Sequence, residues 1–527
     1  MFHRKNSYIL FAVSFVVMLW GGIPGPAWSK AGLPEPKGTF IIGSGIYFSN
    51  IDPNKTNPGS QVVQTFQSLI LPSLIDYHIL PDLAVSWEVT DPKTWKFKIR
   101  KGVKFSNGQP LTSADVQYSF YRQMGKYNRR FPGANKRMWQ KIIDYIETPD
   151  DYTAIIHTKY PDPSALSVLR WIFIVPKAYI EAVGDSKFSK MPVGTGPFMY
   201  VDRKVGESLT LEANPYYWNV NPLKGSRGPA QVKKVILRSM PKEQTRMAAL
   251  KAGEIDGSGI APDSVKNFEN DKNFSIYYSR KNQAYFVMFN WRDAKDPKTG
   301  KPNPFADVRV RRALNHAVDV DALTKNYLTG REYRTTLLGR GGIGYNPNVP
   351  FYSFDPEKAK QLLAEAGYPN GFSTEFYTTA DAPAFLNALT QYFRDIGIRV
   401  EIKQTTPAVA MTRMIRKKFY GMLIWGGGLG GPDPAATFFK TCIRYNGNWA
   451  IHGKDERVEE LVKKQMREFD VKKRAKIIDE VIQILWKDAW FVPLYEPVFV
   501  KVMNNKWNYA NAPTVASFNL SDISLKK

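Results

Sequence analysis

The segment best suited to binding chemistry is a glycine-rich run that directly follows an apolar strand pattern. Residues 425–434 read WGGGLGGPDP, and the pattern at 420–425 predicts a buried strand before them. The run contains G-x-G-x-x-G, but Pro432 and Pro434 interrupt the helix that a dinucleotide site needs next, and the lysine of a phosphate-binding loop is missing. The run is either a flexible connection or a floor that exposes backbone N–H groups to a ligand. Its position after a strand of an α/β sheet favours the floor. Its candidate residues are Trp425, Gly426, Gly427 and Gly428.

Side chains that could catalyse a reaction or hold a metal are sparse and badly spaced. Apart from His3 near the N-terminus, the histidines show no metal-ligand spacing. They are His78, His157, His316 and His452. The sequence has no G-x-S-x-G motif, and the single cysteine, Cys442, has no local protease signature. We therefore expect no catalytic residue, no metal site and no cofactor; a secreted hydrolase is the rival class.

The N-terminus predicts export. A basic start at 3–5 precedes an apolar run at 8–20, and a small-x-small pattern at 27–29 predicts cleavage before Lys30. The apolar run is shorter than the roughly 20 residues that a membrane-spanning helix needs. Cys442 lies too far from the cleavage site to carry a lipid. We therefore expect a periplasmic protein that is not a lipoprotein and has no intramolecular disulfide.

Length and charge narrow the class of protein. A chain of 527 residues exceeds what one hydrophobic core organises, so two lobes are expected. The formal net charge of +25 can attract anionic ligands or acidic surfaces. Basic residues are spread along the chain without a long Lys/Arg run, so no nucleic-acid partner is expected. The charge reflects either an anionic ligand or the general composition of the organism's proteins.

In the first half of the chain, local patterns predict short strands and capped helices. Strands are expected at 39–48, at 95–99 and, returning after a turn, at 103–105. Thr112 and Asp115 form a capping-box pattern at the start of a helix. These elements predict a mixed α/β first lobe.

The second half has the clearer architecture. Between 303 and 328 a helical stripe is followed by a second helix capped by Asp319. The stripe consists of Val310, Ala313, Leu314, Ala317 and Val318, and His316 is expected on the helix surface. Helices then alternate with strands up to Trp425, which indicates right-handed crossovers and a largely parallel sheet. The helices are expected at 355–366, 383–395 and 408–417, and the strands at 372–377, 398–402 and 420–425.

Several of these segments, in this order, resemble the family 5 extracellular solute-binding proteins, the peptide/nickel-type receptors of ABC importers. The block at 83–120 is similar to the family's most recognisable stretch, and the helical segment NPFADVRVRRALNHAVDVDALTKNYL at 303–328 to its hallmark. GTGPF at 194–198, NPYYW at 214–218 and LKAGEID at 250–256 also match. The resemblance covers nearly the whole chain.

The resemblance implies an α/β fold of the two-lobed periplasmic binding protein type (class II, cluster C), with an extra subdomain in lobe one and a two-strand hinge. The hinge is expected where the chain crosses between lobes, near 285–290 and near 494–499. The implied domains are a signal peptide at 1–29, lobe one at 30–287 with a subdomain at about 70–190, lobe two at 288–496, and a return to lobe one at 497–527. The implied function is the substrate-binding component of an ABC importer: a monomer that closes around a peptide-like or other small organic solute and delivers it to an inner-membrane permease.

The sequence departs from peptide-binding relatives at the charged clamp. Those relatives commonly place an acid three positions after the tryptophan, where this chain has Gly428, and dipeptide-type members place an arginine in the segment matching 378–383, which here has none. Recognition is therefore expected to rest on aromatic stacking and backbone hydrogen bonds, with Asp433 as the alternative acid. The aromatic candidates are Trp425, Trp449, Tyr445 and Tyr47. An oligosaccharide, a metal chelate or an acidic ligand is the alternative solute.

Overall fold

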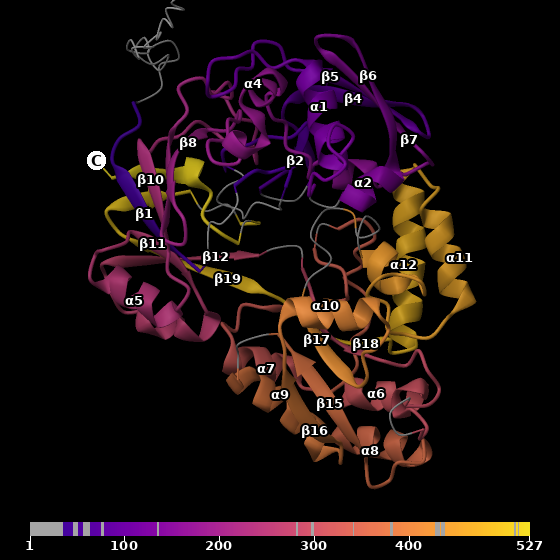
Figure 1. Cartoon of the computed structure of the whole chain (residues 1–527). Coiled ribbons are helices and arrows are strands. Elements are labelled where there is room, and N and C mark those ends of the chain that lie inside the picture. Colours follow the sequence, from indigo (N-terminus) through magenta and orange to yellow (C-terminus); the bar gives the residue numbers. More distant parts are fainter. Residues whose placement is uncertain are drawn as a thin grey trace, which may run out of the picture.

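The chain folds as a mixed α/β protein with several sheets, here described from a computed structural model (Figure 1). The structure describes residues 35–45, 51–55, 64–74, 78–133, 136–280, 283–296, 300–340, 342–379, 383–426, 433, 438–510, 513–514 and 516–526. The predicted signal peptide and the candidate residues Tyr47, Gly427 and Gly428 lie outside these residues. Among the helices that are described, none combines the length and apolar character needed to cross a membrane.

A seven-stranded sheet organises the first lobe. In spatial order it contains β12 (Phe274–Arg280), β19 (Val498–Asn504), β11 (Gly257–Ile260), β1 (Thr39–Ser44), β10 (Lys234–Ser239), β9 (Ser208–Ala213) and β8 (Phe198–Lys204). β1 runs parallel to both of its neighbours, and the other pairs are antiparallel. α5 (Glu243–Lys251) contacts β11 on one side of this sheet. β19 comes from the C-terminal end of the chain, so both ends of the described sequence belong to this lobe.

A second, four-stranded sheet forms a subdomain of the first lobe. It contains β4 (Ala84–Asp91), β5 (Thr94–Ile99), β7 (Thr153–Thr158) and β6 (Ile143–Asp150), in that order. The predicted capping box is present at the start of α1 (Ser113–Met124), where Thr112 N donates to Asp115 Oδ2 at 2.9 Å. The predicted return strand at 103–105 is wrong: only an isolated bridge from Lys104 to Pro110 forms there, because β7 takes the place beside β5. Further elements of this part are β2 (Ile70–Pro72), β3 (Ile79–Pro81), α2 (Lys136–Ile142), α3 (Ala165–Leu169) and α4 (Lys177–Phe188).

A six-stranded sheet organises the second lobe. Its order is β14 (Tyr333–Arg334), β18 (Phe491–Glu496), β13 (Tyr285–Phe289), β17 (Met422–Gly426), β15 (Ser373–Thr378) and β16 (Arg399–Gln404). Only the β17, β15 and β16 part is parallel, as the alternating pattern predicts. β13, β18 and β14, which lie outside the alternating segment, pair antiparallel, so the complete sheet is mixed. The reason is that β13 and β18 belong to the strands that enter and leave the lobe, in opposite directions.

Helices cover this sheet as their apolar stripes require. They are α6 (Val308–His316), α7 (Val320–Tyr327), α8 (Pro356–Glu365), α9 (Pro383–Asp395), α10 (Pro407–Ile415), α11 (Glu456–Gln465) and α12 (Val471–Lys487). All five stripe residues at 310–318 are buried in one core cluster, and Asp319 caps α7 through Ala322 N at 2.9 Å. His316 is not on the surface: it is buried, with Nδ1 2.8 Å from Ser353 O, because the segment before α8 covers it.

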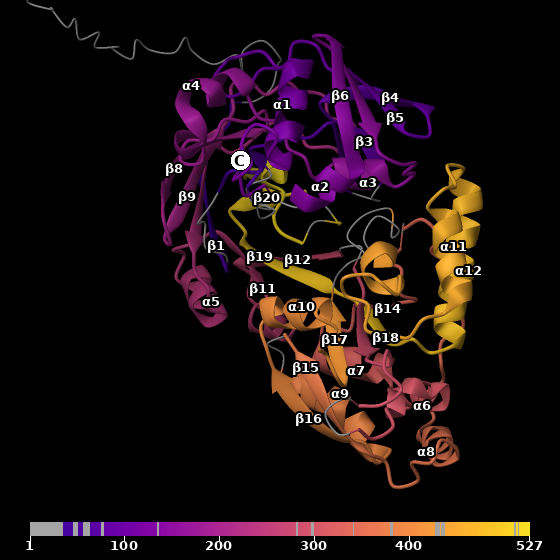
Figure 2. The ribbon, with the colours of Figure 1, turned by 45° about the vertical axis from the view of Figure 1, so that its right-hand side comes forward.

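Two neighbouring strands connect the lobes. In the described chain, one crossing runs from Arg280 of β12 to Tyr285 of β13, and the other from Glu496 of β18 to Val498 of β19. Arg280 pairs with Val498 in the first sheet, and Tyr285 pairs with Tyr495 in the second. The crossings therefore lie side by side (Figure 2). The expected lobe boundary at 287/288 falls inside β13, a few residues beyond this crossing.

The lobes also touch away from the crossings. α11 and α12 stand beside the subdomain, at the right of Figure 2. Phe469, in the segment that connects these two helices, packs on Trp95 of β5, with ring centroids 6.5 Å apart. Lys440 of the second lobe donates to Asp162 Oδ2 at 3.0 Å and to Ser164 Oγ at 3.2 Å, both in the first lobe. These contacts hold the lobes together on the side opposite the paired strands.

Candidate functional site

Trp425 lies at the end of β17, where a buried strand reaches the glycine-rich run. Met422, Leu423 and Ile424 are buried because β17 sits between β13 and β15 with core on both faces. The Trp425 ring is half-buried and lies against Trp449, with centroids 5.6 Å apart and planes at 55°. Its Nε1 is buried and has no hydrogen-bond acceptor among the described residues. An unsatisfied buried donor costs about 1–3 kcal/mol, so this N–H is suited to an incoming acceptor.

Gly426 is explained by packing. A side chain there would collide with the ring of Tyr285, which faces it across the β13–β17 pair. The Tyr285 ring in turn stacks on Tyr495 at 5.2 Å and 13°. The missing side chain of Gly426 thus makes room for a tyrosine stack directly beside the lobe crossings.

The two other described aromatic candidates have different surroundings. Trp449 is half-buried against Trp425, and its backbone N–H donates to Thr441 O at 2.8 Å. The Tyr445 ring is covered on one face by the Arg292 guanidinium, 3.7 Å from its centroid. The structure thus brings Trp425 and Trp449 together and pairs Tyr445 with a cation.

Asp433 belongs to a buried ion pair. Arg474 of α12 donates to Asp433 Oδ2 at 2.6 Å and to Oδ1 at 2.8 Å, and both side chains are 3% exposed. Arg474 also donates to Gln465 Oε1 at 3.2 Å. A bidentate guanidinium–carboxylate pair with this burial ties Asp433 to α12. Sequence reasoning missed Arg474, because nothing local marks an arginine on an amphipathic helix as the partner of a distant acid.

The loop that carries Trp449 is held by a lysine. Lys417 Nζ donates to Ala450 O at 2.9 Å and also to Gly447 O. Burial, followed by repulsion from Arg292, lowers the pKa of Lys417 to about 8. The charged side chains that bond to the backbone of this loop include the cations Lys417 and Arg292 and one acid, Glu459, whose Oε1 accepts from Tyr445 N at 2.6 Å.

Cys442 and His452, two residues of types that could act in catalysis, are both buried. Cys442 is fully buried, and burial raises the pKa of its thiol to about 12, so it is a poor nucleophile. His452 Nε2 lies 2.9 Å from Cys442 O, and burial lowers its pKa to about 4. Within the described residues, His, Cys, Asp and Glu form no group of three or more that could hold a metal ion.

Comparisons with known proteins agree with this architecture. Heme-binding protein A of Haemophilus influenzae is 27% identical over 82% of this chain and 82% of its own length. The periplasmic oligopeptide-binding protein OppA of the same organism is 25% identical over 90% of this chain and 92% of its own. The solved structure of the periplasmic binding protein DppA from Helicobacter pylori, in complex with the peptide STSA, is similar with a TM-score of 0.76 and 27% identity, over 93% of this chain and 98% of that one. Residues 78–448 match the family model described as bacterial extracellular solute-binding proteins, family 5 Middle, and the chain therefore belongs to this family.

Proposed function

We propose that this protein is the periplasmic substrate-binding component of an ABC importer, which binds a peptide-like or other small organic solute between its lobes. The observation that carries this proposal is the pair of adjacent strands that connects two separate sheets. Such a connection allows one lobe to rotate against the other with little change inside either core. The name of the relative OppA supports a peptide-like solute.

Binding works by closure. A solute that touches both lobes stabilises the closed arrangement by its differential affinity for that state. The closed form is then presented to an inner-membrane permease, and the solute is released unchanged. We further propose that residues 1–29 are removed on export, that no lipid is attached and that the protein acts as a monomer without a cofactor or a catalytic step.

The proposed solute site centres on Trp425. Its ring offers a stacking surface next to Trp449, and its Nε1, which meets no acceptor among the described residues, offers a donor. Gly427, Gly428, Tyr445 and Tyr47 remain proposed members from the sequence. Asp433 is left out of our proposal, because Arg474 engages both of its carboxylate oxygens.

An acidic or N-blocked solute is the second candidate. Two cations favour this candidate: Lys417 and Arg292 donate to backbone carbonyls of the loop that carries Trp449. The charge of Asp433 is already neutralised by Arg474. A ligand with a free ammonium group would find repulsion there, whereas a carboxylate would find attraction.

Small-angle scattering tests the proposed mechanism. Small molecules that co-purify with the native protein are first identified by mass spectrometry, and the released compound is added back to stripped protein. The radius of gyration should fall at saturation, and the compound should be recovered chemically unchanged after long incubation. An unchanged radius would contradict closure, and a converted compound would favour the hydrolase alternative.

A further inference from the structure

The first lobe carries a second concave site, remote in sequence from the Trp425 region. A depression of about 480 Å³ is formed by residues that all lie between 55 and 203. Its lining consists of Lys55, Asn128, Arg130, Phe131, Pro132, Asp185, Ser186, Ser189, Lys190 and Arg203. The volume lies within the range of small-ligand sites, and four of the ten lining residues are basic.

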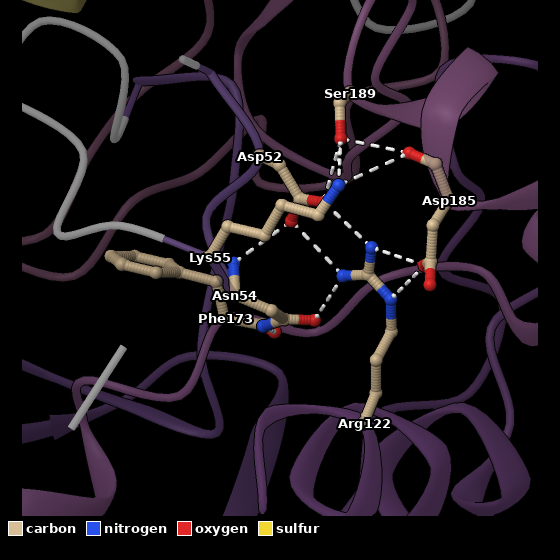
Figure 3. Close-up of polar contacts among 7 residues, drawn as sticks. All are labelled: Asp52, Asn54, Lys55, Arg122, Phe173, Asp185 and Ser189. Atoms are coloured by element: carbon tan, nitrogen blue, oxygen red, sulfur yellow. Dashed lines mark hydrogen bonds and ion pairs between the residues drawn. The ribbon is translucent and has the colours of Figure 1, made fainter. Parts of the chain in front are cut away.

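An ion network, buried at Asp52 and Arg122, reaches the lining of this depression through Asp185. Figure 3 shows the contacts within this network. Arg122 of α1 donates to both oxygens of Asp52, at 3.0 and 2.6 Å, and through Nε and Nη2 to Asp185 Oδ1, at 2.9 and 2.7 Å. Lys55 Nζ lies 3.9 Å from Asp52 Oδ2 and donates to Ser189 Oγ at 2.7 Å. Two carboxylates thus face two cations, and the network neutralises itself.

The remaining lining charge is positive. Asp185 is the one carboxylate among the described lining residues, and Arg122 already binds it. Arg130 and Lys190, which are both exposed, add two positive charges outside the network. Asn128 and Ser186 add neutral hydrogen-bonding groups at the same surface, whereas Ser189 Oγ already donates to Asp185 O at 2.8 Å and accepts from Lys55. This combination of cations and neutral donors is what an oxyanion requires.

The wall that carries Arg130 is fixed in place. The Phe131 ring is contacted by the Arg122 guanidinium and the Lys55 ammonium, 4.4 and 5.6 Å from its centroid. Gly133 approaches the backbone of Gln123 so closely that a side chain there would collide with it. Lys136 Nζ donates to Arg129 O at 2.7 Å. Because these contacts order the wall before any ligand arrives, binding would cost little conformational entropy.

We propose that this depression binds a small multivalent oxyanion, such as a phosphate or a polycarboxylate, independently of the imported solute. The concave shape favours a compact free anion over a flat anionic surface. Arg130 and Lys190 are the exposed cations that would contact the anion, and the Asp52–Arg122–Asp185 ion pairs fix the backbone that carries the lining.

Calorimetry with inorganic pyrophosphate and with citrate, on the full exported chain at low ionic strength, tests this proposal. The double variant Arg130→Gln/Lys190→Gln should bind either anion at least about tenfold more weakly, since both charge-assisted hydrogen bonds to the anion are lost. The matched control is Lys472→Gln/Lys476→Gln, which removes the same amount of charge from exposed positions on α12. It should change the affinity for either anion less than about twofold, because salt screens the attraction between an anion and distant exposed charges.

Equal losses in both double variants would overturn the proposal, because attraction would then come from net charge alone. Binding to vesicles of anionic lipid without binding of either free anion would also overturn it, in favour of a membrane surface. Trp425→Ala should leave anion binding intact, so the outcome is separate from that for the imported solute.

Discussion

At the scale of single residues, substitution of Trp425 is the most direct test of the proposed solute site. Trp425→Ala removes both the ring surface and the Nε1 donor. Solute affinity should fall by about 1–3 kcal/mol, the range of an aromatic anchor. Trp425→Phe keeps a ring and should lose less. The measurement is calorimetry with the co-purified solute, alongside thermal unfolding. A large fall in melting temperature with unaltered affinity would assign the ring to the core instead.

Gly426 carries a packing prediction. Gly426→Ala places a methyl group inside the volume of the Tyr285 ring, so the unfolding free energy should fall by about 1–3 kcal/mol, as in other overpacked cores. Tyr285→Ala removes the obstacle, at its own cost. In the double variant the two losses should be clearly less than additive in denaturant titrations. Additive losses of unfolding free energy would show that the contact with Tyr285 is not the reason for glycine at position 426.

Asp82 carries a pH prediction. Burial raises the pKa of this carboxyl to about 7, from 3.8, although Arg227 opposes the shift. The folded protein therefore keeps the proton up to about pH 7, whereas the unfolded chain releases it near pH 4. Its contribution to stability is present at low pH and is lost as the pH rises through this window, with a slope of up to about 1.4 kcal/mol per pH unit.

Asp82→Asn should remove that slope, measured by denaturant unfolding between pH 4 and 7. Asp144→Asn, at an exposed position, is the control and should leave the profile unchanged. Parallel profiles for the unmutated protein and Asp82→Asn would refute the assignment.

At the scale of elements, the contact between Lys440 and Asp162 is the feature that biases the lobes toward each other. Asp162 is 4% exposed and also accepts from Ser164 N and Oγ, at 3.0 and 2.6 Å. Lys440→Met removes the bridge between the lobes but leaves the Ser164 contacts. The unliganded protein should then open more often, and apparent solute affinity should drop by about 1 kcal/mol or less, as for partly exposed ion pairs.

Scattering of the unliganded protein checks this prediction through a larger radius of gyration. Lys463→Met breaks the ion pair with Glu460, which lies within α11, and should leave the radius unchanged. A radius that is insensitive to Lys440→Met would mean that the contact between Lys440 and Asp162 does not set the lobe arrangement.

The elements also show what the sequence could predict. The stripe of α6 and the caps at Thr112 and Asp319 follow local spacing, so they were predicted correctly. The acidic partners of Arg122 and Arg474 could not be predicted, because Asp52 and Asp433 lie 70 and 41 residues away from them in sequence. The requirement for glycine at 426 likewise depends on Tyr285, a partner that only the strand pairing reveals. Local periodicity therefore predicts where a helix or strand forms, whereas the partners of its polar residues depend on tertiary contacts that the local sequence does not reveal.

At the scale of the whole molecule, the positive charge and the glycine at 428, where peptide-binding relatives commonly place an acid, lead to a prediction about solute class. The chain carries a net charge of +25, and Asp433 is already neutralised by Arg474. A free α-ammonium enclosed without a counter-charge would lose several kcal/mol of solvation. N-acetylated tripeptides should therefore bind more tightly than their free-amine forms, as measured by calorimetry.

Gly428→Asp should shift that preference toward free-amine peptides. The control is the same pair of ligands on Trp425→Ala, which should weaken both alike. Tight binding of free-amine tripeptides by the unmutated protein would refute the prediction and imply another acid at the site.

The burial of Cys442 has a practical consequence for observing this molecule at work. Because its thiol is enclosed and its pKa is raised to about 12, maleimide reagents should not modify it at neutral pH. It is also the single cysteine of the chain. Cysteines introduced at one exposed position in each lobe can therefore carry a donor and an acceptor dye, with the native thiol left in place. Energy transfer between the dyes would then follow opening and closing in individual molecules as solute arrives and departs.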